Sequence, residues 1–159
     1  MKLTQHISMK KLPSFVDPPS ILLVVSPYYE TVTNQLVEGA TQVLKKANVK
    51  INLVEVPGAL EIPTAIRLAS KHFSGFVALG CVIRGETSHY DTVSNESSRA
   101  LSYLGLEGIC IGNGILTVEN YEQAVSRADP SGQNKGGSAA IASLKLLEIR
   151  YKFSQKQSD

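Results

Sequence analysis

Polar and titratable side chains follow directly after an apolar run in the segment Leu79–Leu101. Gly85 allows the backbone to turn sharply there, and Thr87 and Ser88 can cap a helix that follows. Free N–H groups at the start of a helix bind anions, above all phosphate. His89 lies beside them in the sequence and can transfer a proton near neutral pH. The segment therefore predicts a phosphate site with a proton donor, but a plain helix cap beside a surface histidine explains the same residues equally well.

Two earlier stretches place further candidates after expected strands. In Val56–Pro63, Gly58 permits a close approach of the backbone, and Glu61 falls near the start of a helix. The helix dipole favours a carboxylate there, and this carboxylate can bind a polyol or an amine. In SPYYET, Tyr28 and Tyr29 can stack on a planar ligand. Taken singly, a capping glutamate and amphipathic surface tyrosines are the better explanations.

The segment Ser126–Gly137 adds two cations, Arg127 and Lys135, around a loop that contains glycine. The planar guanidinium group of arginine matches the geometry of phosphate. On its own, this stretch is more simply explained as a solvated charged loop.

Several other kinds of chemistry find no support in the sequence. Cys81 and Cys110 lie in apolar runs, form no CxxC pair and have no base nearby in the sequence, so we expect free, buried packing residues. The three histidines are scattered, which argues against a zinc site, and no glycine motif for nucleotide binding occurs. The net charge of +2 and the lack of basic runs argue against nucleic acid and membrane surfaces as partners.

The pattern of apolar residues predicts strands that alternate with helices. Apolar runs predict strands at 20–26, 50–56, 75–83 and 108–112, and helical spacing predicts helices within 30–48, 57–72, 91–106, 119–128 and 137–152. Such alternation is typical of an α/β fold, a three-layer sandwich with a four-stranded, mostly parallel sheet and helices on both faces. Ligands of these sheets bind at the carboxyl ends of the strands, which is where most of the candidate residues fall.

A chain of 159 residues, 43% of them hydrophobic and 19% charged, is expected to form one domain. We expect an extended N-terminal arm at 1–19, a single domain at 20–153 and a polar C-terminal tail at 154–159. No apolar stretch approaches the ~20 residues of a membrane span, and the N-terminus lacks the apolar core of a secretion signal. A cytoplasmic protein is therefore expected.

Four motifs, taken together and in this order, resemble the lumazine synthase family. They are VPGALEIP at 56–63, GCVIRGETSHYDTVSNES at 80–97, GILTVENYEQA at 114–124 and NKGG at 134–137. The resemblance extends from about Ile21 to Tyr151 and is strongest to the alphaproteobacterial type. It implies that the α/β sandwich is flavodoxin-like.

The resemblance also implies a reaction, that of a transferase in riboflavin biosynthesis. The family condenses 5-amino-6-(D-ribitylamino)uracil with 3,4-dihydroxy-2-butanone 4-phosphate to 6,7-dimethyl-8-ribityllumazine, and releases phosphate and water. The amine adds to the ketone to form an imine, phosphate is eliminated, and the ring closes. No metal or organic cofactor is implied.

Each candidate residue acquires a role from the resemblance. Tyr28 would stack on the pyrimidine ring, Glu61 would accept hydrogen bonds from the ribityl hydroxyls, and His89 would be the proton donor. The other substrate-binding positions would be Ala59 and Leu60 at the ribityl chain, Cys81, Val82 and Ile83 at the pyrimidinedione, Glu86, Thr87 and Arg127 at the phosphate, Lys135 in a supporting role, and Asn113.

Two of these positions need a structural explanation. Asn113 stands where many family members carry an aromatic or other apolar residue. Glu86 brings a carboxylate close to the phosphate site, a repulsive arrangement unless its side chain points away or pairs with a cation.

A homo-oligomer built on rings of five subunits is implied as well, with each active site between neighbours. Asn113, Arg127 and Lys135 would then come from the subunit next to the one that supplies Tyr28 and His89. Riboflavin synthase is a candidate partner.

Two alternatives are a flavin or lumazine carrier and a shell-forming paralogue with low turnover. The presence of both His89 and Arg127 favours the enzyme.

Overall fold

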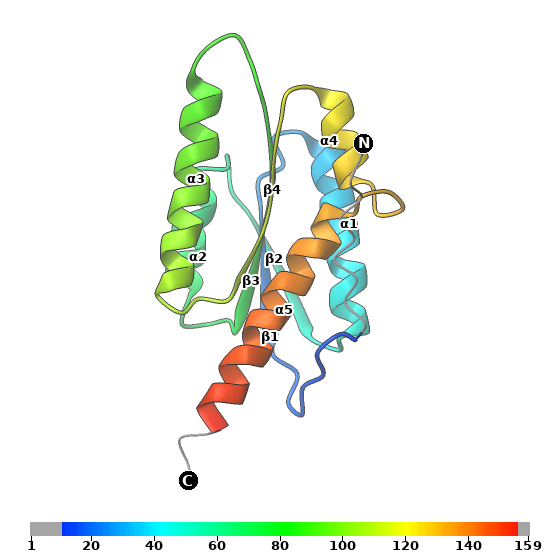
Figure 1. Ribbon diagram of the computed structural model, residues 1–159, viewed down its shortest axis with the longest axis vertical. Coiled ribbons are helices and arrows are strands. Elements are labelled where there is room, and N and C mark those ends of the chain that lie inside the picture. Colours follow the sequence, from blue (N-terminus) through cyan, green and yellow to red (C-terminus); the bar gives the residue numbers. More distant parts are fainter. Residues whose placement is uncertain (1–10, 156–159) are drawn as a thin grey trace.

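The computed structural model describes residues 11–155 (Figure 1). Within them, strands and helices alternate along the chain, as the apolar pattern predicts. The strands are β1 (Ser20–Val25), β2 (Lys50–Glu55), β3 (Gly75–Ile83) and β4 (Ile111–Val118). The helices are α1 (Glu30–Lys46), α2 (Glu61–Ala69), α3 (His89–Leu106), α4 (Tyr121–Ala128) and α5 (Lys135–Ser154).

The described strands form one sheet in the order β2-β1-β3-β4, and every neighbouring pair is parallel. Helices α2 and α3 cover one face of the sheet, and α1, α4 and α5 cover the other (Figure 1). The predicted three-layer α/β fold is thus confirmed. Because the strands are parallel, their carboxyl ends lie together at one edge of the sheet, the edge where such folds bind ligands.

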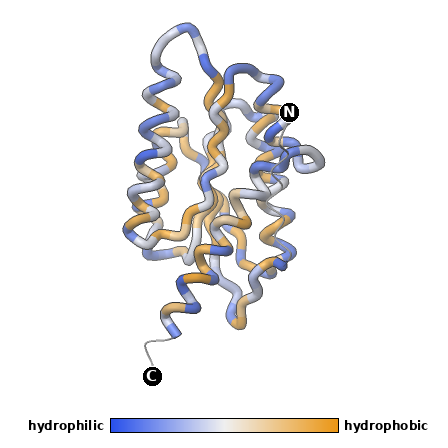
Figure 2. The backbone as a smooth tube through the Cα atoms, viewed as in Figure 1, coloured by the Kyte–Doolittle hydropathy of each residue, from blue (hydrophilic) through white to orange (hydrophobic). Residues whose placement is uncertain are grey.

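Two hydrophobic clusters fill the space between the layers. Successive residues of β1 point to opposite faces of the sheet, so Leu23 belongs to the cluster under α1, α4 and α5, and Val24 to the cluster under α2 and α3. Leu144 and Ile66 contribute from the helices on the two sides, and all four side chains are at most 1% exposed. Figure 2 shows the apolar strands in the middle of the molecule.

The fourth strand differs from the prediction. The run at 108–112 predicts a strand there, whereas β4 extends from Ile111 to Val118. Gly112, Asn113 and Gly114 have low strand propensity, which hides the strand in the sequence. Strand β3 nevertheless offers a parallel partner to every residue of β4, so pairing overrides propensity. As a result β4 ends beside the end of β3 and carries the chain to the ligand-binding edge.

The NKGG motif shapes the start of α5. Asn134 adopts a left-handed conformation with φ 46°, and its side-chain oxygen accepts a hydrogen bond from the N–H of Gly137 at 3.0 Å. Gly136 lies directly against the backbone of Leu36 in α1, where a side chain would overlap it. The motif therefore fixes the first turn of α5, including Lys135, against the rest of the domain.

The described part of the N-terminal arm packs on the domain. The ring of Phe15 contacts Tyr151 of α5 edge-on, with 5.7 Å between the ring centroids, and the N–H of Lys50 donates to the carbonyl of Pro19. Residues 1–10 and 156–159, which make up the rest of the expected arm and most of the expected tail, lie outside the described residues. Between residues 11 and 155, no helix has the length and apolar character needed to cross a membrane.

Candidate active site

A cavity of about 370 Å³ opens where β1, β2 and β3 end. Its walls are the segments that follow these strands together with the first turns of α2 and α3. Nine of the residues indicated by the sequence line it: Tyr28, Ala59, Leu60, Glu61, Cys81, Val82, Ile83, Thr87 and His89. We call it the first cavity. The fold thus brings the predicted aromatic ring, carboxylate and imidazole to one place.

The turn between β3 and α3 keeps its backbone N–H groups free. Thr87 Oγ1 accepts a hydrogen bond from the N–H of His89 at 3.3 Å, and the side chain of Ser88, at the N-cap of α3, makes no capping bond. The N–H groups of residues 85–88 have no hydrogen-bond partner among the described residues. Free N–H groups at a helix start, aligned with the helix dipole, can bind an anion.

The carboxylate of Glu61 and the rings of Tyr28 and Tyr29 also line the first cavity. Glu61 is the first residue of α2, and Gly58 makes room for it, since a Cβ at Gly58 would lie 2.9 Å from Glu61 Oε2. Tyr28 is 75% exposed, and its ring meets that of Tyr29 edge-on with 5.0 Å between centroids. An exposed ring held from one side can accept a planar ligand on its free face.

Burial disfavours ionisation of the Cys81 thiol and the Tyr29 phenol in the first cavity. The Cys81 side chain is 6% exposed, and its burial raises the pKa of the thiol to about 11. Burial also raises the pKa of Tyr29, with smaller contributions from Tyr28 and Cys81. A protonated thiol is a poor nucleophile, so Cys81 is a wall residue, as the sequence indicated. Cys110 is likewise buried and free.

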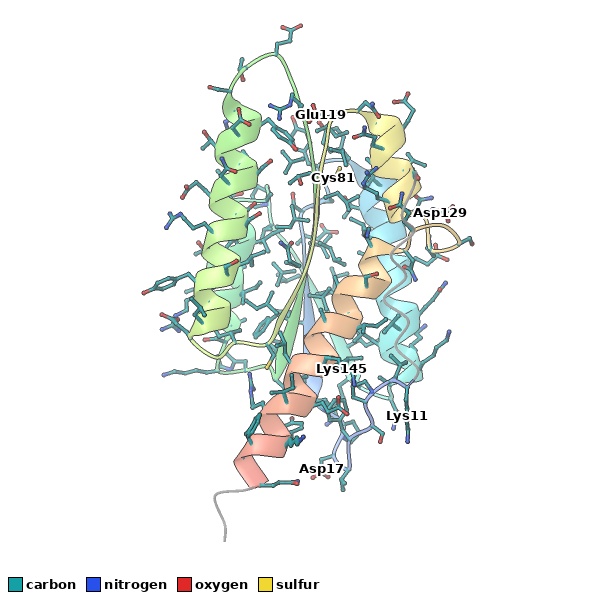
Figure 3. The ribbon with its side chains drawn as sticks, viewed as in Figure 1. Lys11, Asp17, Cys81, Glu119, Asp129 and Lys145 are labelled. Carbon is teal, nitrogen blue, oxygen red and sulfur yellow. The ribbon has the colours of Figure 1, made fainter. Side chains whose placement is uncertain are left out.

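Arg84 ties the turn before α3 to the rest of the sheet edge. Its Nε donates to Glu119 Oε2 at 2.8 Å and its Nη1 to Asp91 Oδ1 at 3.3 Å. Its guanidinium carbon lies 4.1 Å from the centroid of the Tyr90 ring. The hydrogen bond to Glu119 is the largest cause that raises the pKa of Arg84. Figure 3 shows Glu119 at the carboxyl end of the sheet, between α3 and α4.

Three further predicted residues, two cations and one amide, lie outside the first cavity. Asn113, Arg127 and Lys135 line a second cavity of about 400 Å³ beside β4 and α5, and none of them lines the first. Arg127 Nη1 donates to the carbonyl of Gln123 at 3.2 Å. Asn113 Oδ1 accepts the N–H of Ile115 at 3.0 Å, so this position presents an amide held by its own strand.

Glu86 lines neither cavity and is exposed. It forms no ion pair with any residue in the range 11–155. Of the two explanations open for this carboxylate, a side chain directed away from the cavity fits the structure. Its backbone N–H remains one of the free groups of the turn.

Three lining residues of the first cavity escaped the sequence prediction: Ser26, Tyr90 and Val93. A usable signal existed for two of them. Val93 lies one helical turn after His89, so both share a face of α3. Ser26 directly follows β1, at the ligand-binding edge. Tyr90 is held in place by Arg84, a contact that spacing alone does not reveal.

Comparison with known proteins identifies the family. The sequence profile of 6,7-dimethyl-8-ribityllumazine synthase matches residues 18–150. A 6,7-dimethyl-8-ribityllumazine synthase from Jannaschia sp. (strain CCS1) is 54% identical over 140 residues, which cover 87% of this chain and 79% of that protein. Those from Novosphingobium aromaticivorans and Agrobacterium fabrum are 50% and 49% identical, and the matches cover 84% and 85% of this chain and 97% of each relative. The chain belongs to the 6,7-dimethyl-8-ribityllumazine synthase family.

Proposed function

We propose that the two cavities of this lumazine synthase are two halves of one kind of active site. There 5-amino-6-(D-ribitylamino)uracil condenses with 3,4-dihydroxy-2-butanone 4-phosphate to give 6,7-dimethyl-8-ribityllumazine, phosphate and water. The observation that carries the proposal is the first cavity, which unites Tyr28, Glu61 and His89 from three separate segments. The second cavity supplies the cations that the first one lacks.

The ribitylaminouracil binds along the Tyr28–Glu61 side of the first cavity. The exposed Tyr28 ring stacks on the pyrimidine, and Cys81, Val82 and Ile83 hold its edge through backbone groups at the end of β3. Ala59 and Leu60 follow the ribityl chain, and the Glu61 carboxylate accepts hydrogen bonds from its hydroxyls. A neutral Cys81 thiol leaves the amine of the substrate as the nucleophile.

The butanone phosphate binds at the opposite end. Its phosphate lies on the free N–H groups of the turn at Glu86 and Thr87, and the guanidinium of Arg127 balances its charge. His89 begins α3 beside this turn and donates the proton as the amine adds to the ketone. Holding both substrates in one cavity makes the condensation effectively intramolecular.

Each active site is shared between subunits in a ring of five. The separation of Arg127, Asn113 and Lys135 from the first cavity supports this, because a neighbouring chain can bring them there. The edge strand β2 supports association as well, since it exposes Leu53 and Val54 by 48% and 40%. Lys135 then assists near the substrates from the neighbouring chain.

An absorbance assay for lumazine formation, with both substrates supplied, tests the proposal. Turnover by the wild-type protein supports it, whereas tight binding of riboflavin without turnover favours the flavin or lumazine carrier. A shell-forming paralogue of low turnover would form large particles in light scattering without matching catalysis. A cytoplasmic location and a partnership with riboflavin synthase, which would use the product, belong to the same proposal.

A further inference from the structure

The side chain of Arg84 is held by three contacts, two to the first turn of α3 and one to the segment after β4. Glu119 follows β4, Asp91 lies in the first turn of α3, and the Tyr90 ring belongs to the wall of the first cavity. The backbone N–H of Arg84 also donates to the carbonyl of Val118, at the end of β4, at 3.0 Å. The residue directly before the free turn 85–88 is therefore fixed through both its backbone and its side chain.

These contacts are poorly suited to stabilise the fold. The side chains of Arg84, Asp91 and Glu119 are 41%, 56% and 57% exposed. Exposed ion pairs contribute only ~0.2–1 kcal/mol each to stability. These contacts do, however, restrict the orientation of the residues involved, because a planar guanidinium donates to two carboxylates while it lies on an aromatic ring. Lysine cannot reproduce that geometry.

The charges around the turn also call for such a residue. The exposed Glu86 lies within the turn whose N–H groups are to receive a phosphate, and Asp91 and Glu119 lie against Arg84, the residue directly before that turn. Arg84 pairs with two of these three carboxylates. Without Arg84, the unpaired negative charges of Asp91 and Glu119 would repel a phosphate that approaches the turn.

We propose that Arg84 is a positioning residue for the reaction, with Glu119 as its anchor. It does not line the first cavity and so acts through its neighbours: it fixes the turn 85–88, whose N–H groups bind phosphate, and it holds Tyr90 in the cavity wall. This inference rests on the proposed function, since it concerns the phosphate-bearing substrate of that site.

The test compares Arg84→Met, Arg84→Lys and Glu119→Gln with a matched control. Arg99→Met removes a different exposed arginine, which lies within α3 and pairs with the Glu96 carboxylate. Steady-state kinetics give KM for each substrate, and calorimetry gives the affinity for inorganic phosphate. Circular dichroism on heating confirms that each variant is folded.

We expect Arg84→Met to raise KM for the butanone phosphate and Kd for inorganic phosphate about tenfold, the equivalent of one lost charge-assisted interaction. KM for the ribitylaminouracil should stay within about twofold of the wild type. Arg84→Lys should recover only part of the loss, because it restores the charge but not the fork. Glu119→Gln should shift the same constants, and its effect should not add to that of Arg84→Met.

Equal constants for Arg84→Met and Arg99→Met would overturn the inference, and so would a rise of both KM values together. Complete rescue by Arg84→Lys would reduce the residue to a simple charge and overturn its positioning role. If the wild type formed no lumazine, the proposed function would fail, yet phosphate affinity would still test Arg84. Wild-type protein that binds no phosphate, or variants that bind it equally well, would then count against the inference.

Discussion

His89, the proposed proton donor, lies at the start of α3 and in the wall of the first cavity. Its side chain is exposed, so replacement by alanine should leave the fold intact. We expect kcat of His89→Ala to fall about 100-fold, the low end of the effect of general acids, because an amine condenses with a ketone in water unaided. The absorbance assay measures this, and an unchanged kcat would exclude His89 as the donor.

Arg127 should act on binding rather than on proton transfer. Its guanidinium lines the second cavity and is steered by a hydrogen bond to the carbonyl of Gln123. If Arg127 binds the phosphate as proposed, Arg127→Ala removes a charged partner, so we expect KM for the butanone phosphate to rise tenfold or more, from a loss of ~1.5–3 kcal/mol. KM for the ribitylaminouracil should change less. A butanone phosphate KM equal to that of the wild type would show that Arg127 is misassigned.

The reactivity of Cys81 tests how far its thiol is shielded from solvent in the wall of the first cavity. Burial raises its pKa from 9.0 to about 11, so its thiolate fraction near pH 8 should be about 100-fold below that of an exposed cysteine. In a Cys110→Ala background, iodoacetamide should label the folded protein slowly and the urea-unfolded protein fast. The folded-state rate should rise with each pH unit up to about 11. Fast labelling at neutral pH would show an ionised, accessible thiol instead.

At the scale of elements, strands and helices can be predicted from the sequence where they form continuous apolar runs or show helical spacing. Strands β1 and β3 are buried from end to end or nearly so, and their runs are unmistakable. Strand β4 has no such apolar run, because it carries Gly112 and Gly114 where α5 packs closely against it. The candidate residues after β1, β2 and β3 could be found for the same reason: a parallel sheet places the ends of its strands together.

Gly112 shows what that space is for. A Cβ at this position would overlap the carbonyl oxygen of Ala139 in α5, so Gly112→Ala must push the helix off the strand. We expect a loss of ~1–3 kcal/mol in the free energy of unfolding. Gly105→Ala is the matched control: nothing lies within 4 Å of its Cβ, and in a helix the change should stabilise by ~0.5–1 kcal/mol. Urea unfolding measures both, and equal effects would refute the close packing of α5 on β4.

At the scale of the whole molecule, the residues proposed for one active site line two separate cavities of the chain. Sequence motifs indicate that Arg127 and Lys135 belong with His89, but no spacing along a chain can show that they line a different cavity. Only the fold shows that Arg127 and Lys135 lie apart from His89. In the proposed ring, the second cavity of a neighbouring copy would complete the first cavity of its partner.

Mixing subunits tests this directly. Two impaired variants, His89→Ala and Arg127→Ala, are unfolded together, refolded as mixed rings and assayed at a butanone phosphate concentration below its KM, where both are slow. If His89 and Arg127 of one active site come from different chains, about a quarter of the sites in an equal mixture contain both intact residues, and activity returns to that extent.

The matched control mixes His89→Ala with Tyr28→Ala, two variants of the same cavity. Every site then lacks one of the two residues, whichever chains meet, so activity should stay at the level of the separate variants. Recovery in the first mixture alone would locate Arg127 and His89 on neighbouring chains. No recovery in either mixture, with mixed rings verified by mass spectrometry, would mean that each chain completes its own site and that Arg127 must reach the first cavity by a rearrangement within one subunit.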